Sequence, residues 1–130
     1  MMVKMTTAPI QKKILVVDDD KAVTALLGDL LTRHGYTVLV ANDGLDAMVQ
    51  VGGNSPDLIV LDIMMPEING YDVCRDIKFD KRFKHIPIII LTSREQELDP
   101  GIGKLMGIDY THKPIDSKLL LEKIQKALKQ

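Results

Sequence analysis

The chain has 130 residues, a net charge of -1 at pH 7, 45% hydrophobic residues and 27% charged residues. This length predicts one domain, because domains commonly contain about 100–150 residues, and the composition excludes an intrinsically disordered chain. The balanced charge and the aromatic content of 4% argue against direct nucleic-acid binding. No apolar run approaches the ~18–20 residues that span a bilayer. Without a signal-peptide pattern, and with a single cysteine, the expected location is the cytoplasm.

The first residues of the chain lack the hydrophobic pattern of the rest. Residues 1–11 show no periodic placement of apolar residues. We therefore expect a flexible N-terminal tail at residues 1–11 and one folded domain at residues 12–130. No internal repeat or low-complexity segment divides that domain.

The first half of the domain alternates short apolar runs with segments of helical periodicity. Residues 14–17 predict a strand buried on both faces, and apolar residues spaced helically over 23–31 predict the helix that follows. A second strand is expected at 36–41. A short helix, capped at residue 42 or 43, then leads into an expected turn at 52–56.

The middle of the chain repeats this alternation. Residues 58–61 predict a buried strand that ends in the carboxylate of Asp62. A loop at 66–70 leads into a helix that carries apolar residues at 73–77. Residues 78–85 are rich in basic side chains and are expected to form a solvated loop.

The last third predicts two further strands and two helices. Residues 86–91 form an apolar run, and Asp99-Pro100 is typical of a helix start. A brief strand is expected at 109–112. The final helix is expected to begin at residue 116 or 117.

Alternating strands and helices predict an α/β fold with a parallel sheet and helices on both faces. For five strands, the flavodoxin-like doubly wound (βα)5 arrangement with strand order 2-1-3-4-5 is the expected solution. Ligands of such folds bind at the carboxyl ends of the strands, between strands 1 and 3.

Most of these strands end in residues that can carry chemistry. Three carboxylates gathered in one crevice would repel one another and would need a cation, and oxygen ligands suit Mg²⁺. A lysine ammonium can hold a phosphoryl oxygen, a threonine hydroxyl can donate a hydrogen bond to another, and a carboxylate can act as the nucleophile that forms an aspartyl phosphate. The residues that follow strands 1, 3, 4 and 5 are Asp18 and Asp19, Asp62, Thr92 and Ser93, and Lys113.

Taken together, these motifs resemble the receiver domain of a two-component response regulator. The resemblance covers residues 12–130. The matching segments are Val17-Asp18-Asp19, Leu61-Asp62-Ile63-Met64-Met65-Pro66, Gly70, Leu91-Thr92-Ser93 and Tyr110 with Lys113-Pro114.

The resemblance implies a phosphoacceptor and a metal site. Asp62 would accept a phosphoryl group from a sensor histidine kinase or a phosphotransfer domain. The side chains of Asp19 and Asp62 and the backbone carbonyl of Met64 would bind Mg²⁺, with Asp18 binding it directly or through water. The domain would catalyse only its own phosphotransfer and autodephosphorylation, so it would not be an enzyme in the usual sense.

The resemblance also implies a conformational switch. Lys113 would pair with the phosphoryl group and with Asp62, and the Lys113-Pro114 bond would commonly be cis. Thr92 would hydrogen-bond the phosphoryl oxygen, and Tyr110 would pack inward in response. A downstream protein or output domain would bind the surface made by the fourth helix, the fifth strand and the last helix. A phosphorylation-dependent homodimer is one association that the resemblance allows.

Two features depart from the family pattern. The interval from Thr92 to Lys113 is about one residue shorter than usual. Because its predicted helix contains three glycines, at 101, 103 and 107, we expect a short or mobile helix there. Met64 and Arg94 occupy positions that flank the path of the hydrolytic water in this family, and a methionine cannot orient water. We therefore predict slow autodephosphorylation.

Three other functions are less consistent with the sequence. A haloacid-dehalogenase-like phosphatase would need Asp-x-Asp after strand 1 and usually an inserted cap. A nonphosphorylated pseudo-receiver would lack an acidic residue or the lysine. A nucleotide-binding Rossmann unit would need Gly-x-Gly-x-x-Gly after strand 1. Whether the chain stands alone or is part of a larger regulator stays open at this stage.

Several other side chains are expected to be structural. Cys74 lies on an apolar helix stripe and is expected in the core. The three histidines, His34, His85 and His112, have no metal-binding spacing and are expected on the surface. The basic cluster expected in a solvated loop consists of Lys78, Lys81, Arg82 and Lys84.

Overall fold

The structure of the protein is a computed structural model that describes residues 11–63, 69–92 and 107–129. Most of the predicted tail at 1–11 lies outside the described residues, and so does the helix predicted to begin at Asp99. No helix in the described ranges combines the length and the apolar character that crossing a membrane requires.

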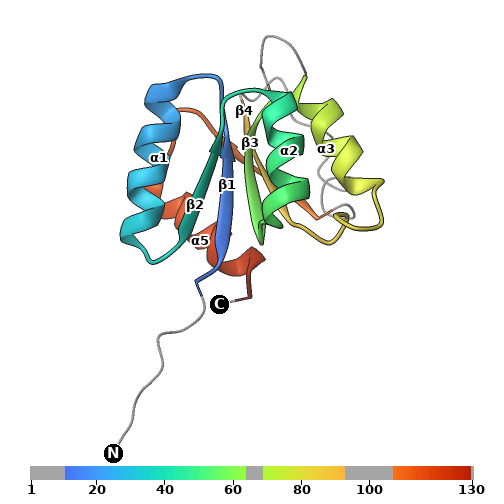
Figure 1. Ribbon diagram of the computed structural model, residues 1–130. Helices are drawn as coiled ribbons and strands as arrows, with labels where there is room; N and C mark the ends of the chain where they lie inside the picture. The colour runs from blue at the N-terminus through green and yellow to red at the C-terminus, as the bar shows by residue number, and fades with distance from the viewer. Residues whose placement is uncertain (1–10, 64–68, 93–106, 130) are drawn as a thin grey trace, which may run out of the picture.

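Five strands form one parallel sheet in the described part of the chain (Figure 1). Their order is β2-β1-β3-β4-β5, which confirms the predicted flavodoxin-like topology. Every residue of β3 and β4 is buried, as expected for the β-branched, apolar central strands of a parallel sheet. The strands are β1 (Lys13–Val17), β2 (Thr37–Ala41), β3 (Leu58–Asp62), β4 (Ile88–Thr92) and β5 (Ile108–His112).

The described helices all begin at polar capping residues. The side chain of Asp20, Asp43, Asn69 or Asp116 accepts a hydrogen bond from a backbone N–H of the first turn and so satisfies a group that has no partner within the helix. The helices are α1 (Lys21–Arg33), α2 (Gly44–Asn54), α3 (Gly70–Lys78) and α5 (Ser117–Ala127).

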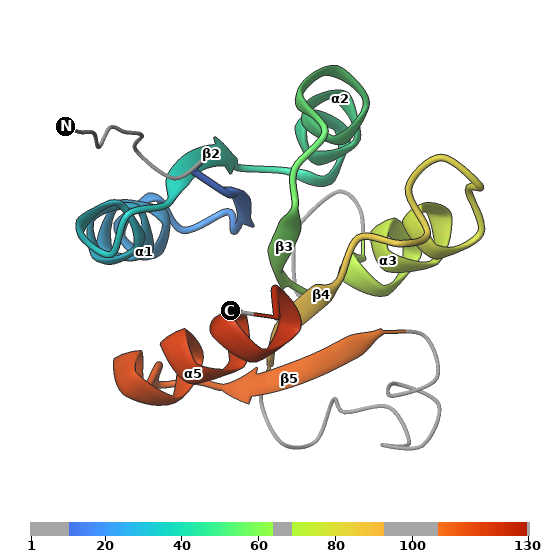
Figure 2. The same ribbon diagram turned by 90° about the horizontal axis from the view of Figure 1, so that it is seen from below.

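The helices cover both faces of the sheet and create two hydrophobic cores. Figure 2 shows α1 and α5 on one face and α2 and α3 on the other. Leu27 and Leu31 of α1 pack with Leu120 and Ile124 of α5 in one core, and α2 and α3 contribute apolar side chains to the other. Burial of these side chains from both faces fixes the sheet between the two helical layers.

The strand register aligns the carboxyl ends of the strands at one edge of the sheet. Val17 pairs with Leu61, Asp62 with Leu91, and Thr92 with His112. Residues that directly follow these strands therefore meet at the same edge. This alignment is what the sequence-based prediction of a single crevice requires.

Several element boundaries differ from the prediction by a residue or more, and two of the differences have a clear cause. Residues 52–54, predicted as part of a turn, form the end of α2, which is capped by Ser55 in the left-handed conformation (φ 46°). The helix tolerates Gly52 and Gly53 in its last turn because both are exposed and leave no gap in the core. Strand β4 begins at Ile88 rather than at residue 86, because Pro87 has no N–H to donate to a strand ladder.

Two side chains are less exposed than predicted. Lys78 ends α3 instead of lying in a solvated loop, and its ammonium donates hydrogen bonds to the carbonyl oxygens of Lys84 and Ile86. Burial lowers the pKa of Lys78. His112 is half-buried at the end of β5, whereas the other two histidines are exposed as predicted.

Candidate functional site

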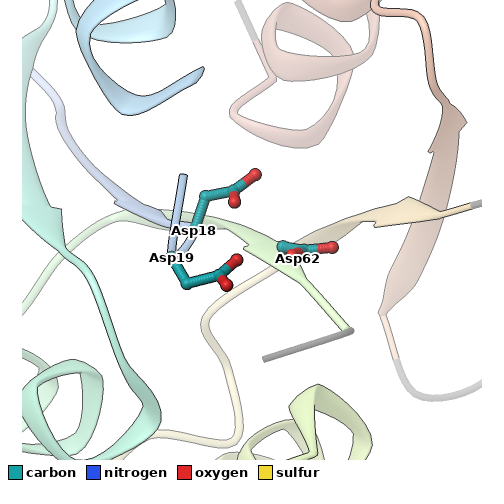
Figure 3. A group of neighbouring side chains, drawn as sticks. All are labelled: Asp18, Asp19 and Asp62. Atoms are coloured by element: carbon teal, nitrogen blue, oxygen red, sulfur yellow. The ribbon is translucent and has the colours of Figure 1, made fainter. Parts of the chain in front are cut away.

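Three carboxylates from two strand ends come together at the carboxyl edge of the sheet. Asp18 and Asp19 follow β1, and Asp62 ends β3, with their carboxylates directed to the same side (Figure 3). One carboxylate oxygen from each lies within 4.8 Å of the others. Asp18 and Asp62 are buried, with 0% and 4% of their surface exposed, whereas Asp19 is exposed. The cluster is therefore closed on the protein side and open to solvent at Asp19.

The donor set fits a hard divalent cation. All three side chains offer carboxylate oxygens, which Mg²⁺ prefers. Two oxygens at opposite positions around Mg²⁺ lie about 4.2 Å apart, twice the Mg–O distance of about 2.1 Å. The observed spread of up to 4.8 Å is close to this value, so small side-chain rotations would close the cluster around an ion.

The charge on Asp18 is unfavourable in its surroundings. Burial raises the pKa of Asp18, and the neighbouring Asp62 raises it further, whereas the N–H of Asp20 and the ammonium of Lys113 lower it. The N–H of Asp20 donates to Oδ1 of Asp18 at 3.0 Å. The net result is a raised pKa, chiefly because burial removes the charged carboxylate from water.

Lys113 supplies the positive charge opposite the carboxylates. Its Nζ lies 3.4 Å from Oδ2 of Asp18 and 3.4 Å from Oδ1 of Asp62. Its backbone N–H donates to the carbonyl of Thr92 at 3.1 Å, which fixes the residue beside the end of β4. Burial lowers the pKa of Lys113, but the two carboxylates more than offset this effect, so the pKa is raised and the side chain stays charged. The Lys113–Pro114 peptide bond is cis, as the family resemblance implied.

The two predicted switch residues lie on neighbouring strands, Thr92 at the carboxyl end of β4 and Tyr110 in the middle of β5. Thr92 ends β4 and is 2% exposed. Tyr110 lies in β5, is 9% exposed and packs within the core that α2 and α3 cover. The carbonyl of Tyr110 accepts a hydrogen bond from Nζ of Lys123, which connects β5 to α5.

The described residues thus bring together most of the site residues expected from the sequence. Asp18, Asp19 and Asp62 form one cluster, the ammonium of Lys113 lies beside Asp18 and Asp62, and Thr92 ends β4 at the same edge of the sheet. Met64 and Arg94 lie outside the described residues. Asp20 is not part of this cluster, because its side chain caps α1.

One supporting residue was missed by the sequence reasoning. Nδ2 of Asn42 donates to the backbone carbonyl of Asp18 at 3.0 Å, so the end of β2 holds the end of β1 in place. The available signal was its position directly after β2, at the same sheet edge as the carboxylates. Asn42 had been considered only as a helix cap, a role that Asp43 takes.

Cys74 takes no part in this site. It is 2% exposed within the core, and burial raises the pKa of its thiol to about 11. A thiol with so high a pKa is protonated at neutral pH and is a poor nucleophile. This confirms the prediction of a structural cysteine.

The family model for the response regulator receiver domain matches residues 14–125. Protein PilH of Pseudomonas aeruginosa is 38% identical, covering 89% of this chain and 97% of its own length. The alkaline phosphatase synthesis transcriptional regulatory protein PhoP of Bacillus subtilis is also 38% identical, covering 92% of this chain and 49% of its own length. The chain thus spans about half the length of some of these relatives and nearly the whole length of others.

Solved structures show the same fold. A putative response regulator from Chloroflexus aurantiacus matches with a TM-score of 0.82 and 31% identity, covering 92% of this chain and 99% of that one. The chemotaxis protein CheY4 of Vibrio cholerae matches with a TM-score of 0.78 and 28% identity, covering 90% of this chain and 98% of that one.

Proposed function

The chain belongs to the family of response regulator receiver domains, and from this premise we propose that it is a phosphorylation-dependent switch with Asp62 as its phosphoacceptor. Receiver domains are phosphoacceptors rather than conventional enzymes. A histidine kinase or phosphotransfer domain would supply the phosphoryl group. The receiver domain is proposed to span residues 12–130, with residues 1–11 as a tail.

The proposed transfer is a single displacement at phosphorus. A carboxylate oxygen of Asp62 forms the new O–P bond while the P–N bond of the donor phosphohistidine breaks, and the released imidazole takes up a proton. Bound Mg²⁺ would supply neutralising charge to the phosphoryl oxygens. Asp18, Asp19 and Asp62 would hold the ion with their carboxylates, and the backbone carbonyl of Met64 is proposed as a further ligand.

Lys113 carries the argument for this function. Its ammonium lies 3.4 Å from the proposed acceptor and the same distance from a second buried carboxylate. A phosphoryl group on Asp62 would therefore form beside a fixed positive charge, which stabilises the charge on its equatorial oxygens. A structural ion pair would need one carboxylate for one ammonium, whereas here the ammonium contacts two buried carboxylates and a third, Asp19, lies in the same cluster.

The switch is proposed to run from Thr92 through β5 to α5. A phosphoaspartate adds charge near -2 and strong acceptor oxygens, and the hydroxyl of Thr92 would donate to one of them. Movement of Tyr110 would then reach α5 through the hydrogen bond between its carbonyl and Lys123. Such a change shifts an equilibrium between existing arrangements and does not create a new fold.

The output surface is proposed to include β5 and α5. A cleft of about 530 Å³ lies there, lined by the first residues of β4 and β5 and by the end of α5. Asp109, Lys123 and Lys126 place both charge signs along it. A downstream protein, an output domain or a second copy of this chain would bind this surface; the remaining helix of the predicted surface lies outside the described residues.

The phosphatase alternative finds no support in the site. Asp18 and Asp20 have the Asp-x-Asp spacing that such enzymes use. However, Oδ1 of Asp20 accepts the N–H of Ala22 at 2.9 Å and caps α1, and Asp20 is not part of the carboxylate cluster found among the described residues.

Acetyl phosphate with Mg²⁺ tests the proposal directly. Transfer to a carboxylate oxygen breaks the P–O bond of the donor and releases acetate. Intact-mass spectrometry should show one added phosphoryl group on the wild type and none on Asp62→Asn. The matched control is Asp57→Asn, because Asp57 lies at the opposite end of the sheet, where its carboxylate accepts the N–H of Lys13. Labelling that survives in Asp62→Asn, or is lost in the control, would place the acceptor elsewhere.

A further inference from the structure

Gly70, the first residue of α3, leaves no space for a side chain. A β-carbon built on Gly70 would lie 2.4 Å from Cα of Ile63 and 2.6 Å from the carbonyl oxygen of Asp62. Both neighbours are backbone atoms, so rotation of a side chain cannot relieve the contact. The backbone at the start of α3 therefore rests directly on the peptide that follows the proposed phosphoacceptor.

Local hydrogen bonds hold this arrangement in place. The N–H of Gly70 donates to the carbonyl of Ile63 at 2.8 Å. Oδ1 of Asn69 accepts the N–H of Tyr71 at 2.8 Å and so sets where α3 begins. The helix start and the end of β3 are thus joined across the chain segment between them.

We infer that Gly70 is a positioning residue for Asp62: its missing side chain lets α3 pack against the Asp62–Ile63 peptide and so sets where the acceptor carboxylate lies. This inference rests on the proposed function. The backbone of Asp62 is held on one side by β4, because Asp62 pairs in register with Leu91. The contact with α3 fixes the other side, and together they set the direction of the carboxylate toward Asp18 and Lys113.

The requirement at this position is space and not backbone conformation. Gly35 and Gly107 have positive φ angles of 91° and 70°, where any side chain is strained, but Gly70 does not have a positive φ. An alanine at the start of a helix would normally be favourable relative to glycine. Helix propensity alone therefore predicts that Gly70→Ala makes the protein more stable. The close backbone contact predicts that the same substitution makes it less stable.

The size of the effect follows from the contact distance. Ordinary contacts of a β-carbon begin at 3.4 Å, so the 2.4 Å contact with Ile63 requires a separation of at least 1.0 Å more. A displacement of this size at a reacting group can reduce a rate about 100-fold. We expect labelling of Asp62 by acetyl phosphate to slow by about 10- to 100-fold in Gly70→Ala.

The chain offers a matched glycine as a control. Gly52 lies in α2 and is exposed, and a β-carbon there would meet nothing within 4 Å. Gly52→Ala should label at the wild-type rate and should unfold at a higher temperature than the wild type. A second control, Ile124→Val, removes one buried methylene from α5 and reports the effect of lower stability alone.

The experiment measures the labelling rate at saturating Mg²⁺ and the Mg²⁺ dissociation constant, by calorimetry, for the wild type and all three variants. Gly70→Ala is also placed in the Gly52→Ala background, so that both quantities are read on folded protein. A slower rate and weaker Mg²⁺ binding in Gly70→Ala alone support the inference. A folded Gly70→Ala protein with the rate and affinity of the wild type, or of Ile124→Val, overturns it. If the wild type takes no label, the proposed function fails, and the Mg²⁺ dissociation constants alone decide the role of Gly70.

Discussion

The carboxylate cluster predicts that removing the charge of Asp18 stabilises the metal-free protein. At an effective dielectric constant of about 20, two charges 4.8 Å apart repel by about 3.5 kcal/mol, and two charges 3.4 Å apart attract by about 5 kcal/mol. Asp18 faces two carboxylates and one ammonium, so repulsion exceeds attraction by about 2 kcal/mol. Its burial adds to this cost, and the hydrogen bond from the N–H of Asp20 reduces it. Solvent screening weakens both the repulsion by the exposed Asp19 and the attraction to Lys113, whose side chain is 40% exposed.

We therefore expect Asp18→Asn to raise the free energy of unfolding in EDTA by about 1–2 kcal/mol, since asparagine keeps the shape and loses the charge. The change corresponds to a rise in Tm of roughly 4 °C per kcal/mol for a chain of this size. Adding Mg²⁺ should stabilise the wild type, through binding to the folded state, and should stabilise Asp18→Asn much less.

Thermal unfolding by circular dichroism, in EDTA and in Mg²⁺, measures both effects. The matched control is Asp20→Asn, which also removes one negative charge and preserves the helix cap, because asparagine caps as well as aspartate. The control should keep the full Mg²⁺ dependence. If Asp18→Asn is less stable than the wild type in EDTA, the reasoning about uncompensated charge is wrong.

Three further predictions follow from the same site and core. Because the folded-state pKa of Asp18 is raised above its ordinary 3.8, the charged form opposes folding. The free energy of unfolding of the metal-free wild type, measured by urea titration, should therefore rise relative to that of Asp18→Asn as pH falls from 7 toward 4. A difference that stays constant with pH would contradict this prediction. Lys113→Met removes the charge that balances the carboxylates; it should abolish labelling by acetyl phosphate and lower metal-free stability by roughly 1 kcal/mol, the side chain being 40% exposed. Cys74 should react with a thiol reagent at pH 8 only as fast as the protein opens, and urea should accelerate the reaction; rapid labelling of folded protein would show that the thiol is accessible.

The topology could be predicted because its signals are local in the sequence. Short β-branched runs alternate with helical periodicity, and parallel strands joined by helices have few arrangements. The site followed from the same pattern: the residues after each strand must meet at one edge, and Asp18, Asp62 and Lys113 do so. The family resemblance then assigned proposed roles to these positions.

The missed features depend on contacts between segments that are distant in the sequence. The amide of Asn42 reaches the backbone of Asp18 only because β2 lies beside β1. Lys78 is half-buried because the carbonyls of Lys84 and Ile86 fold back toward the end of α3. Gly70 lacks space for a side chain because the backbone of α3 touches the backbone after β3. A sequence motif shows that a glycine is present there, but it does not show this contact.

The most direct test of the central claim is to locate the bound cation. Amide NMR spectra recorded with substoichiometric Mn²⁺ in place of Mg²⁺ should lose intensity for residues 18–20, 62–63 and 113, which surround the carboxylate cluster. Residues near Asp57, at the opposite end of the sheet, should keep their signals. Broadening centred near Asp57, or spread evenly over the acidic surface, would contradict the account.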